Sequence, residues 1–263
     1  MTRKTKTAAG SGDGGIYDRY WKHLLLREIG VEGQAILSKS AVLVVGCGAL
    51  GCMLASLMTR AGVGRIRIVD DDIPKLRDLH RQLLFDEKDV KAKRPKVEAA
   101  TARLELANSS VKVEGIRAKA TKRNIRKLLR GMDLVLDASD SLETRYLVNE
   151  ACHQDRKPWI YAGLLGTTGL VMPIRFGEGP CLRCLYPDPG LIENAPGCDE
   201  RGVLSTAVVA VASIQATEGM KILFDSPEAA RDMICLDIWN ATIRHVVVKR
   251  RETCPVCGVK SAS

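Results

Sequence analysis

Val42-Leu43-Val44-Val45-Gly46-Cys47-Gly48-Ala49-Leu50-Gly51 places an aliphatic run directly before a G-x-G-x-x-G motif. The residues that follow, from Cys52 to Met58, include no helix breaker. The stretch therefore predicts a buried strand, a glycine turn and a helix. Gly46 and Gly48 allow the backbone to turn tightly near a phosphate, and Gly51 allows close packing of the helix on the strand. The helix N-terminus would offer free N–H groups to that anion. Alone, the motif indicates a nucleotide site, with a glycine-rich turn of another α/β protein as the alternative.

The remaining chain alternates candidate strands with candidate helices. This order predicts an α/β fold, a Rossmann-like doubly wound sheet that is mainly parallel and ends in antiparallel strands. The predicted strands after the first are Arg65–Val69, Val111–Ile116, Asp133–Asp137, Trp159–Ala162, Leu170–Phe176, Met233–Trp239 and Thr242–Val248. The predicted helices include Val31–Ser40, Pro95–Ala107, Leu142–Cys152 and Leu204–Phe224, after a short helical stretch that begins at Tyr17 and ends at Gly30. We expect a disordered tail over 1–15 and one domain over 16–263.

Composition is that of an ordinary globular protein. The 263 residues are 46% hydrophobic and 27% charged. The longest strictly apolar run in the late helical region, Ala207–Ala212, has six residues, too few to span a bilayer. The N-terminal segment has no apolar core typical of a signal peptide. We therefore expect a cytoplasmic protein without a membrane association.

Positive charge is concentrated in one part of the chain. The formal net charge is +9, and eight basic residues lie between Lys112 and Arg130. Such a stretch is most often a solvated surface. The alternative is a docking surface for an acidic protein or for RNA.

Four of the nine cysteines form the strongest further signal. Cys181-Leu182-Arg183-Cys184 and Cys254-Pro255-Val256-Cys257 are two C-x-x-C knuckles. Each pair can chelate a metal with two thiolates, and together Cys181, Cys184, Cys254 and Cys257 complete the tetrahedral coordination of Zn²⁺. Because all four positions are filled by protein, we expect a closed structural site. Reduced thiols or a redox-active pair are the alternatives.

The other cysteines carry weaker signals. Cys47, Cys52, Cys152 and Cys235 lie in apolar or helical contexts and are predicted to be small core residues. Cys198 lies in a polar stretch predicted to be a loop over 190–202, with charged neighbours. It is a candidate nucleophile or thioester carrier, and an idle accessible thiol is the alternative.

Charged residues suited to phosphate chemistry follow several predicted strands. Asp70 ends the second strand about 20 residues after the glycine motif, where a ribose hydroxyl is bound in such folds. Arg81 and Lys96 can neutralise phosphate charge, and Asp140 can hold Mg²⁺. The carboxyl ends of the strands of a doubly wound sheet would collect these groups in one crevice.

These motifs together resemble the ubiquitin-activating-enzyme-like adenylyltransferases, which include the molybdopterin-synthase and thiamine-biosynthesis sulfur-carrier protein adenylyltransferases. The resemblance covers Tyr17–Cys257, including the knuckle positions. Besides the ATP loop at Gly46–Gly51, the matching motifs are Asp70-Asp71-Asp72, Asp78-Leu79-His80-Arg81-Gln82, Pro95-Lys96, Asp137-Ala138-Ser139-Asp140-Ser141 and the loop cysteine with its following residues, Cys198-Asp199-Glu200-Arg201-Gly202. This combination is far more specific than the glycine motif.

The resemblance implies a role for each matching residue. Asp70 and Asp72 would hold the ribose side of ATP, Arg81 and Lys96 would bind its phosphates, and Asp140 would bind Mg²⁺. Gln82 would help shape the phosphate site. Arg19, in a Tyr-x-Arg context, would be donated across a homodimer to the partner's triphosphate.

The implied reaction is attack by the C-terminal glycine carboxylate of a small ubiquitin-like sulfur-carrier protein on the ATP α-phosphate. The products are an acyl-adenylate and pyrophosphate. Three positions depart from the family pattern: Asp78 and Arg77 replace the usual Asn and Ser, and Ser141 replaces an Asn. An Asp beside a triphosphate is unfavourable unless Mg²⁺ or Arg77 compensates its charge.

Three other functions remain open from the sequence. An RNA-acting member of the same superfamily, a tRNA threonylcarbamoyladenosine dehydratase, would suit the basic stretch, but the paired zinc knuckles argue against it. A nicotinamide-dependent dehydrogenase would leave Arg81, Lys96 and Asp140 without a role. A scaffold that lost ATP binding through Asp78 is the third. We therefore expect ATP, Mg²⁺ and Zn²⁺ as cofactors and no nucleic-acid partner.

Overall fold

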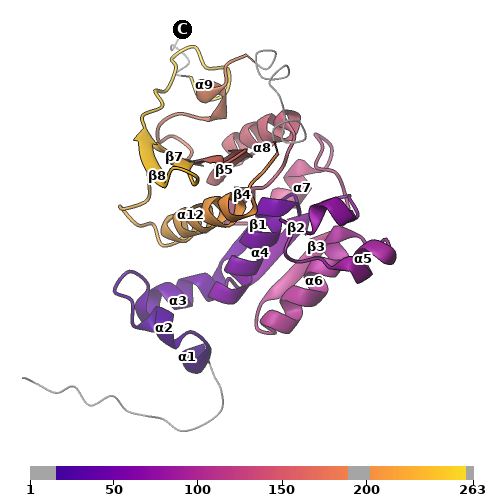
Figure 1. The fold of residues 1–263 in the computed structure, drawn as a ribbon. Coiled ribbons are helices and arrows are strands. Elements are labelled where there is room, and N and C mark those ends of the chain that lie inside the picture. Colours follow the sequence, from indigo (N-terminus) through magenta and orange to yellow (C-terminus); the bar gives the residue numbers. More distant parts are fainter. Residues whose placement is uncertain (1–15, 189–201, 259–263) are drawn as a thin grey trace, which may run out of the picture.

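The strands of the described residues form one eight-stranded sheet in the order β3-β2-β1-β4-β5-β6-β7-β8 (Figure 1). This computed structural model describes residues 16–188 and 202–258. The strand order places β1, which precedes the glycine motif, at the centre of the parallel part. The chain continues to β2 and β3 on one side of β1 and then to β4 and β5 on the other, so the direction of the connections reverses next to β1. The predicted tail over 1–15 and Cys198 lie outside the described residues.

Five neighbouring strands are parallel, and their bounds are β1 Ala41–Val45, β2 Arg65–Val69, β3 Lys112–Ile116, β4 Leu134–Asp137 and β5 Trp159–Leu165. In this register Val45 lies between Val69 and Asp137. The residues that follow these three strands, Gly46, Asp70 and Ala138, therefore meet at one edge of the sheet. This alignment positions the candidate site.

The other end of the sheet is antiparallel. It comprises β6 Thr168–Ile174, β7 Met233–Asp237 and β8 Thr242–Val246, with β6 paired to β5. The predicted mainly parallel sheet with an antiparallel finish is confirmed.

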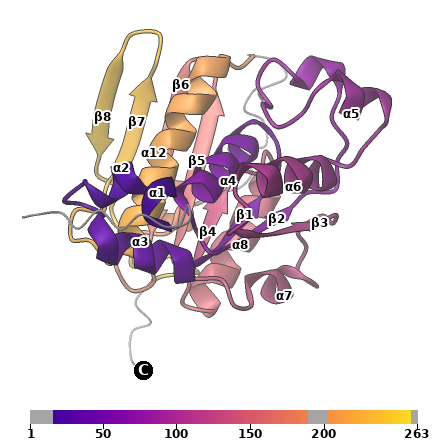
Figure 2. The same cartoon turned by 90° about the horizontal axis from the view of Figure 1, so that it is seen from below.

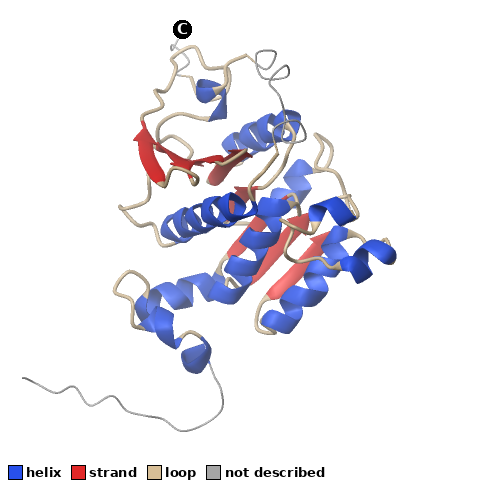
Figure 3. Cartoon of the chain, viewed as in Figure 1, coloured by secondary structure: helices blue, strands red, loops and turns tan. Residues whose placement is uncertain are grey.

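Helices cover both faces of the sheet (Figures 2 and 3). Val42 and Val44 pack into one core cluster and Leu43 into the other, as the alternation of side chains along a strand requires. The first cluster lies under α4 Ala49–Ala61, α6 Lys96–Ala107 and the long apolar α12 Ser205–Leu223. The second lies under α7 Ile125–Leu129 and α8 Leu142–Gln154, beside the short α9 Leu182–Leu185.

The N-terminal helices differ from the prediction. They are α1 Ile16–Arg19, α2 Trp21–Leu24 and α3 Gly30–Lys39. Gly30 begins α3 with φ +57°, a conformation that redirects the chain, rather than ending a continuous helix. Leu25 and Leu26, between α2 and α3, are 61% and 47% exposed in the single chain.

Two short helical segments complete the fold, the 3₁₀ turn η1 Leu76–Asp78 and α5 Glu87–Lys91. Both lie in the connection between β2 and α6. No helix in the described part of the chain is long and apolar enough to cross a bilayer.

Candidate ATP and metal sites

The glycine turn is wedged between β1 and the turn that follows β4. Gly46 has φ +99°, and a Cβ there would come within 2.5 Å of the Ala138 carbonyl oxygen. A Cβ on Gly51 would lie 2.0 Å from the Gly46 carbonyl oxygen, so helix and turn touch through this glycine. Around Gly48, in contrast, the nearest atom to a built Cβ is Nε2 of Gln82 at 4.0 Å. Gly48 therefore leaves room for a ligand to approach the backbone at the start of α4.

The carboxylate of Asp70 is bound to the glycine turn. It accepts a hydrogen bond from the Cys47 backbone N–H at 2.6 Å and another from the Asp72 N–H at 2.8 Å. Burial raises the pKa of the Asp70 carboxyl above its ordinary value, and the nearby Lys96 opposes that shift. Asp70 thus lies beside the turn, at the end of β2, as its predicted contact with a ribose requires.

Lys96 is the buried cation of this edge. Its side chain is only 6% exposed, and its Nζ lies 3.0 Å from a carboxylate oxygen of Asp72. Burial works against the charged form, but the carboxylates of Asp70 and Asp72 outweigh it and raise the pKa of Lys96. Lys96 is therefore held charged beside the acid cluster formed by Asp70 and Asp72.

Asp78 and Arg81 form an ion pair at the C-terminal end of η1. Arg81 Nη2 lies 3.2 Å from Asp78 Oδ1, and its Nη1 donates to the Arg77 carbonyl at 2.9 Å. The sequence analysis left Mg²⁺ or Arg77 to compensate the Asp78 charge; the structure shows that Arg81, at i,i+3 spacing, pairs with Asp78. The ion pair with Asp78 therefore engages the guanidinium of Arg81, the group that the sequence analysis assigns to the phosphates of ATP.

Gln82 is buried against the glycine turn. It is 5% exposed, and its Oε1 accepts no hydrogen bond from any described residue. A buried acceptor without a partner is unfavourable unless a ligand or a water supplies the donor. Gln82 therefore lies beside the glycine turn with an unpaired acceptor, and its part in shaping the phosphate site stays a prediction.

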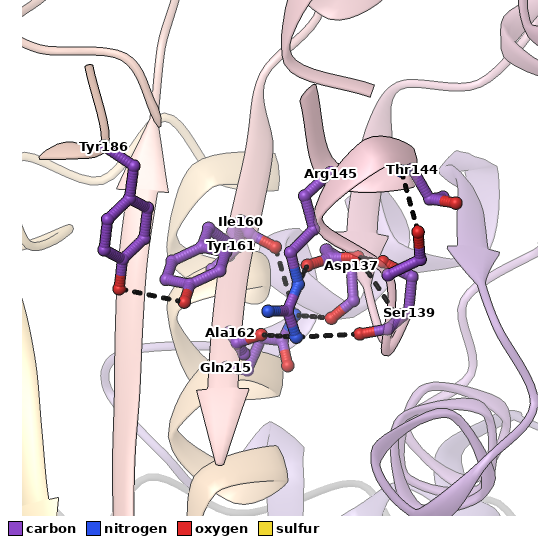
Figure 4. Close-up of polar contacts among 10 residues, drawn as sticks. Asp137, Ser139, Thr144, Arg145, Ile160, Tyr161, Ala162, Tyr186 and Gln215 are labelled. Atoms are coloured by element: carbon purple, nitrogen blue, oxygen red, sulfur yellow. Dashed lines mark hydrogen bonds and ion pairs between the residues drawn. The ribbon is translucent and has the colours of Figure 1, made fainter. Parts of the chain in front are cut away.

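Asp140 lies in the turn after β4. The buried ion pair of Asp137 and Arg145 holds this turn in place (Figure 4). Asp137 is fully buried, and its carboxylate accepts hydrogen bonds from the Ser139 N–H and hydroxyl. Arg145 Nε lies 3.3 Å from Asp137, and Arg145 Nη2 donates to the Ser139 carbonyl at 2.8 Å. The sequence analysis missed Arg145; its only signal was an arginine in the first turns of a half-buried helix.

Arg19 lies away from these groups within one chain. Its Nη1 donates to the carbonyl of Ala107, the last residue of α6, whereas Lys96 is the first residue of that helix. A twelve-residue helix is about 18 Å long. The structure therefore does not bring Arg19 to its own chain's site, and its predicted contribution to a partner's site stays a prediction.

The four knuckle cysteines come together as a closed cluster. The Sγ atoms of Cys181, Cys184, Cys254 and Cys257 all lie within 4.8 Å of one another, and all four residues are buried. Burial opposes ionisation of Cys254, but the backbone N–H groups of Cys257 and Val256 lower its pKa to about 7. Four thiol donors in such a cluster have the chemistry and number that structural Zn²⁺ requires.

The remaining cysteines follow the prediction. Cys47, Cys52 and Cys152 are buried, and Cys235 is half-buried in β7. None of these four belongs to the metal-ligand cluster found among the described residues.

The later part of the basic stretch lies at the opposite ends of the strands from Asp70 and Asp140. Arg126, Lys127 and Arg130 line a surface pocket of about 410 Å³ with Gly131. Gly131 precedes β4, whereas Asp140 follows it. These three basic residues therefore lie away from the candidate ATP site, whereas Arg117 directly follows β3, whose last residue pairs with the last residue of β2 at the end of the sheet where Asp70 lies.

Comparison with known proteins identifies the family. Residues 20–256 match the ThiF family. A sulfur carrier protein adenylyltransferase of Thermus thermophilus is 38% identical over 247 residues, which cover 92% of this chain and 90% of that protein. The SAMP-activating enzyme E1 of Haloferax volcanii is 37% identical over 242 residues, covering 92% and 88%.

A solved structure shares the fold. The crystal structure of E. coli MccB superposes with a TM-score of 0.80 over 95% of this chain and 75% of that chain, at 21% identity. At that identity the likeness concerns the fold alone. The family match and the two relatives, together with the site geometry, show that this chain belongs to the ThiF family, as its resemblance to ubiquitin-activating-enzyme-like adenylyltransferases predicted.

Proposed function

We propose that this protein adenylates the C-terminal glycine carboxylate of a small ubiquitin-like sulfur-carrier protein that ends in Gly-Gly, using ATP and releasing pyrophosphate. One observation supports this most directly. The buried Lys96, the carboxylates of Asp70 and Asp72 and the open backbone at Gly48 lie together at the carboxyl ends of the parallel strands. The names of the relatives from Thermus and Haloferax agree with this chemistry.

Each side chain has a distinct task in the proposed reaction. Asp70 and Asp72 bind the ribose side of ATP, while Lys96 and Arg81 neutralise its phosphates. The carrier's carboxylate oxygen attacks the α-phosphorus, and the bond to the bridging oxygen breaks as pyrophosphate leaves. The step needs charge neutralisation and alignment more than a general base, which the basic groups supply. Asp140 would hold Mg²⁺, which supplies further charge neutralisation on the phosphates.

The proposal includes three further assignments. Zn²⁺ on the four cysteines has a structural role, because no position is open for a substrate. Arg19 acts across a homodimer, since it lies at the far end of α6 from its own Lys96. The reaction takes place in the cytoplasm, where thiols stay reduced and available to zinc.

ATP–pyrophosphate exchange tests the function. We expect exchange that depends on an added carrier protein ending in Gly-Gly, and none with tRNA in its place. Absence of exchange with every such carrier, in protein shown to be folded, contradicts the proposal. Exchange that requires tRNA would favour the RNA-acting branch instead.

Cys198 is proposed to take part in the later transfer of sulfur, as a nucleophile or thioester carrier. In a Cys198→Ala variant we expect adenylation to persist and sulfur transfer to fail. If this variant still supports full sulfur transfer, the Cys198 thiol has no role in that transfer.

A further inference from the structure

The turn Ala138–Asp140 is held from inside the fold by one arginine. Arg145 Nη2 donates to the Ser139 carbonyl at 2.8 Å and to the Ala162 carbonyl at 3.3 Å, while its Nε faces Asp137 (Figure 4). Its guanidinium also lies over the ring of Tyr161, 5.2 Å from the centroid. Three elements, β4, α8 and β5, are thereby joined at this side chain.

Asp137 closes the same turn from the other side. Its Oδ1 accepts hydrogen bonds from the Ser139 N–H at 3.0 Å and from the Ser139 hydroxyl at 2.6 Å. Its backbone carbonyl accepts from Gln215 Nε2 of α12 at 2.8 Å. Ser139 is thus fixed through its amide, its hydroxyl and its carbonyl, one residue before Asp140.

The turn is also in contact with the glycine motif. The Ala138 N–H donates to the Val45 carbonyl at 2.9 Å, and the Ala138 carbonyl is the atom that excludes a side chain at Gly46. Asp140 itself is exposed, and its carboxylate accepts no hydrogen bond from a described residue. The position of Asp140 relative to the glycine turn is therefore set by the residues before it.

We infer that Arg145, with Asp137 as its counter-charge, is a positioning residue that sets the place of the Asp140 carboxylate for the metal that accompanies ATP. This inference rests on the proposed function, in which Asp140 holds Mg²⁺. Residues that orient a metal ligand change metal affinity by about 10- to 100-fold when they are removed. A planar guanidinium can bind Asp137 and the Ser139 carbonyl at once, which a lysine ammonium does far less well.

ATP affinity measured with and without Mg²⁺ tests this role without needing a carrier protein. In the parent chain we expect Mg²⁺ to increase ATP affinity. In Arg145→Gln and in the double variant Asp137→Asn/Arg145→Gln, we expect that gain to shrink by about tenfold, while the metal-free affinity stays near the parent value. For Arg145→Lys we expect a gain in ATP affinity with Mg²⁺ that lies between the gain of the parent chain and that of Arg145→Gln.

Arg67→Gln is the matched control. Arg67 has a similarly buried side chain, pairs with Glu114 at 2.8 Å and donates to the carbonyls of Leu128 and Arg130. These carbonyls lie before β4, at the sheet edge away from Asp140, so this variant should keep the full gain with Mg²⁺.

Two results overturn the inference: an unchanged Mg²⁺ gain in the Arg145 variants, or a loss of ATP affinity that is equal with and without Mg²⁺. If none of those variants folds, Ser139→Ala decides, because it removes only the hydroxyl bond to Asp137. It should lower the gain several-fold, and an unchanged gain contradicts the inference. A parent chain that binds ATP without any gain from Mg²⁺ instead contradicts the role of Asp140 in the proposed function.

Discussion

Lys96 Nζ lies 3.0 Å from a carboxylate oxygen of Asp72, and the lysine side chain is 6% exposed while that of Asp72 is 67% exposed. The buried cation is thus compensated by an acid that can move into solvent. In the proposed function, a triphosphate would take over the contact with Lys96, and Asp72 would turn toward the ribose. Under that proposal, a lysine that is buried in the free protein would serve as a phosphate ligand.

Lys96→Ala should therefore abolish most of the activity. We expect carrier-dependent ATP–pyrophosphate exchange to fall by about 100-fold or more, the usual cost of removing a charge-stabilising donor. Because the pKa of Lys96 is raised, the lysine stays charged throughout the working range and should add no basic limb to the pH profile. Lys91→Ala, an exposed lysine paired with Glu87, is the control and should leave exchange unchanged. Unaltered exchange in Lys96→Ala contradicts the phosphate assignment.

Asp78→Asn should strengthen ATP binding. The Asp78 carboxylate now holds Arg81 at 3.2 Å and competes with phosphate for that guanidinium. Releasing Arg81 is expected to tighten ATP binding by about two- to fivefold, the range of a partly exposed ion pair. Asp86→Asn is the control, since Asp86 also pairs with an arginine, Arg103 at 2.8 Å, and caps α5. Titration calorimetry with ATP measures both variants, and weaker binding in Asp78→Asn would show that this acid supports the site.

The parts of the site that the sequence predicted are those encoded by short spacings. Glycines two and three residues apart around Cys47, and paired cysteines around Arg183, define local backbone shapes that need no knowledge of the rest of the chain. The sheet alignment then brings Asp70 and the turn before Asp140 to the glycine motif, as the rule for parallel strands predicts.

The parts that escaped depend on burial and side-chain direction. Arg145 acts on a turn six residues earlier, because α8 folds back over the end of β4. Arg81, three residues after the end of η1, pairs with Asp78, and the direction of its side chain cannot be read from the sequence. At Gly30 the sequence predicts a stop, but a positive φ serves equally well to start the next helix.

As the pH falls, adenosine binding should weaken, and the loss should begin at a higher pH than it would with an aspartate of ordinary pKa. Burial raises the pKa of Asp70 above 3.8, so protons neutralise this carboxylate earlier as the pH falls, and the neutral form accepts ribose hydroxyls less well. Adenosine is the right probe because it lacks titrating phosphates. In Asp70→Asn we expect weaker binding with a smaller pH dependence, and the part that remains comes from protonation of the adenine ring. An identical pH dependence in parent and variant contradicts the assignment of Asp70 to the ribose.

For stability, the same shift has the opposite consequence. A buried carboxyl with a raised pKa favours the folded state when protonated, so its contribution is present in acid and is lost as the pH rises through the folded pKa. Asp70→Asn removes this buried charge. We expect it to melt at the same temperature as the parent, or higher, at neutral pH, although it binds adenosine less well. A lower melting temperature at neutral pH would show that the two N–H bonds to the carboxylate outweigh its burial.

Removing zinc should destabilise the fold without touching the ATP site directly. Cys184 and Cys254 are separated by 69 residues, and a metal that joins them closes this loop in the unfolded chain as a cross-link does. Cross-links of that length contribute about 4 kcal/mol, which corresponds to a loss of about 8–16 °C in melting temperature for a chain of this size. We expect about one zinc per chain by elemental analysis, and Cys254→Ser or a strong chelator should remove it and lower the melting temperature by that amount.

Cys235→Ser is the control, because Cys235 is a half-buried thiol of β7 outside the cluster, and this variant should keep the metal. Because the cysteines bind the metal as thiolates and protons compete for them, zinc affinity should fall as the pH drops. Zinc retained by Cys254→Ser, or an unchanged melting temperature after its loss, would contradict a structural metal that joins the two knuckles.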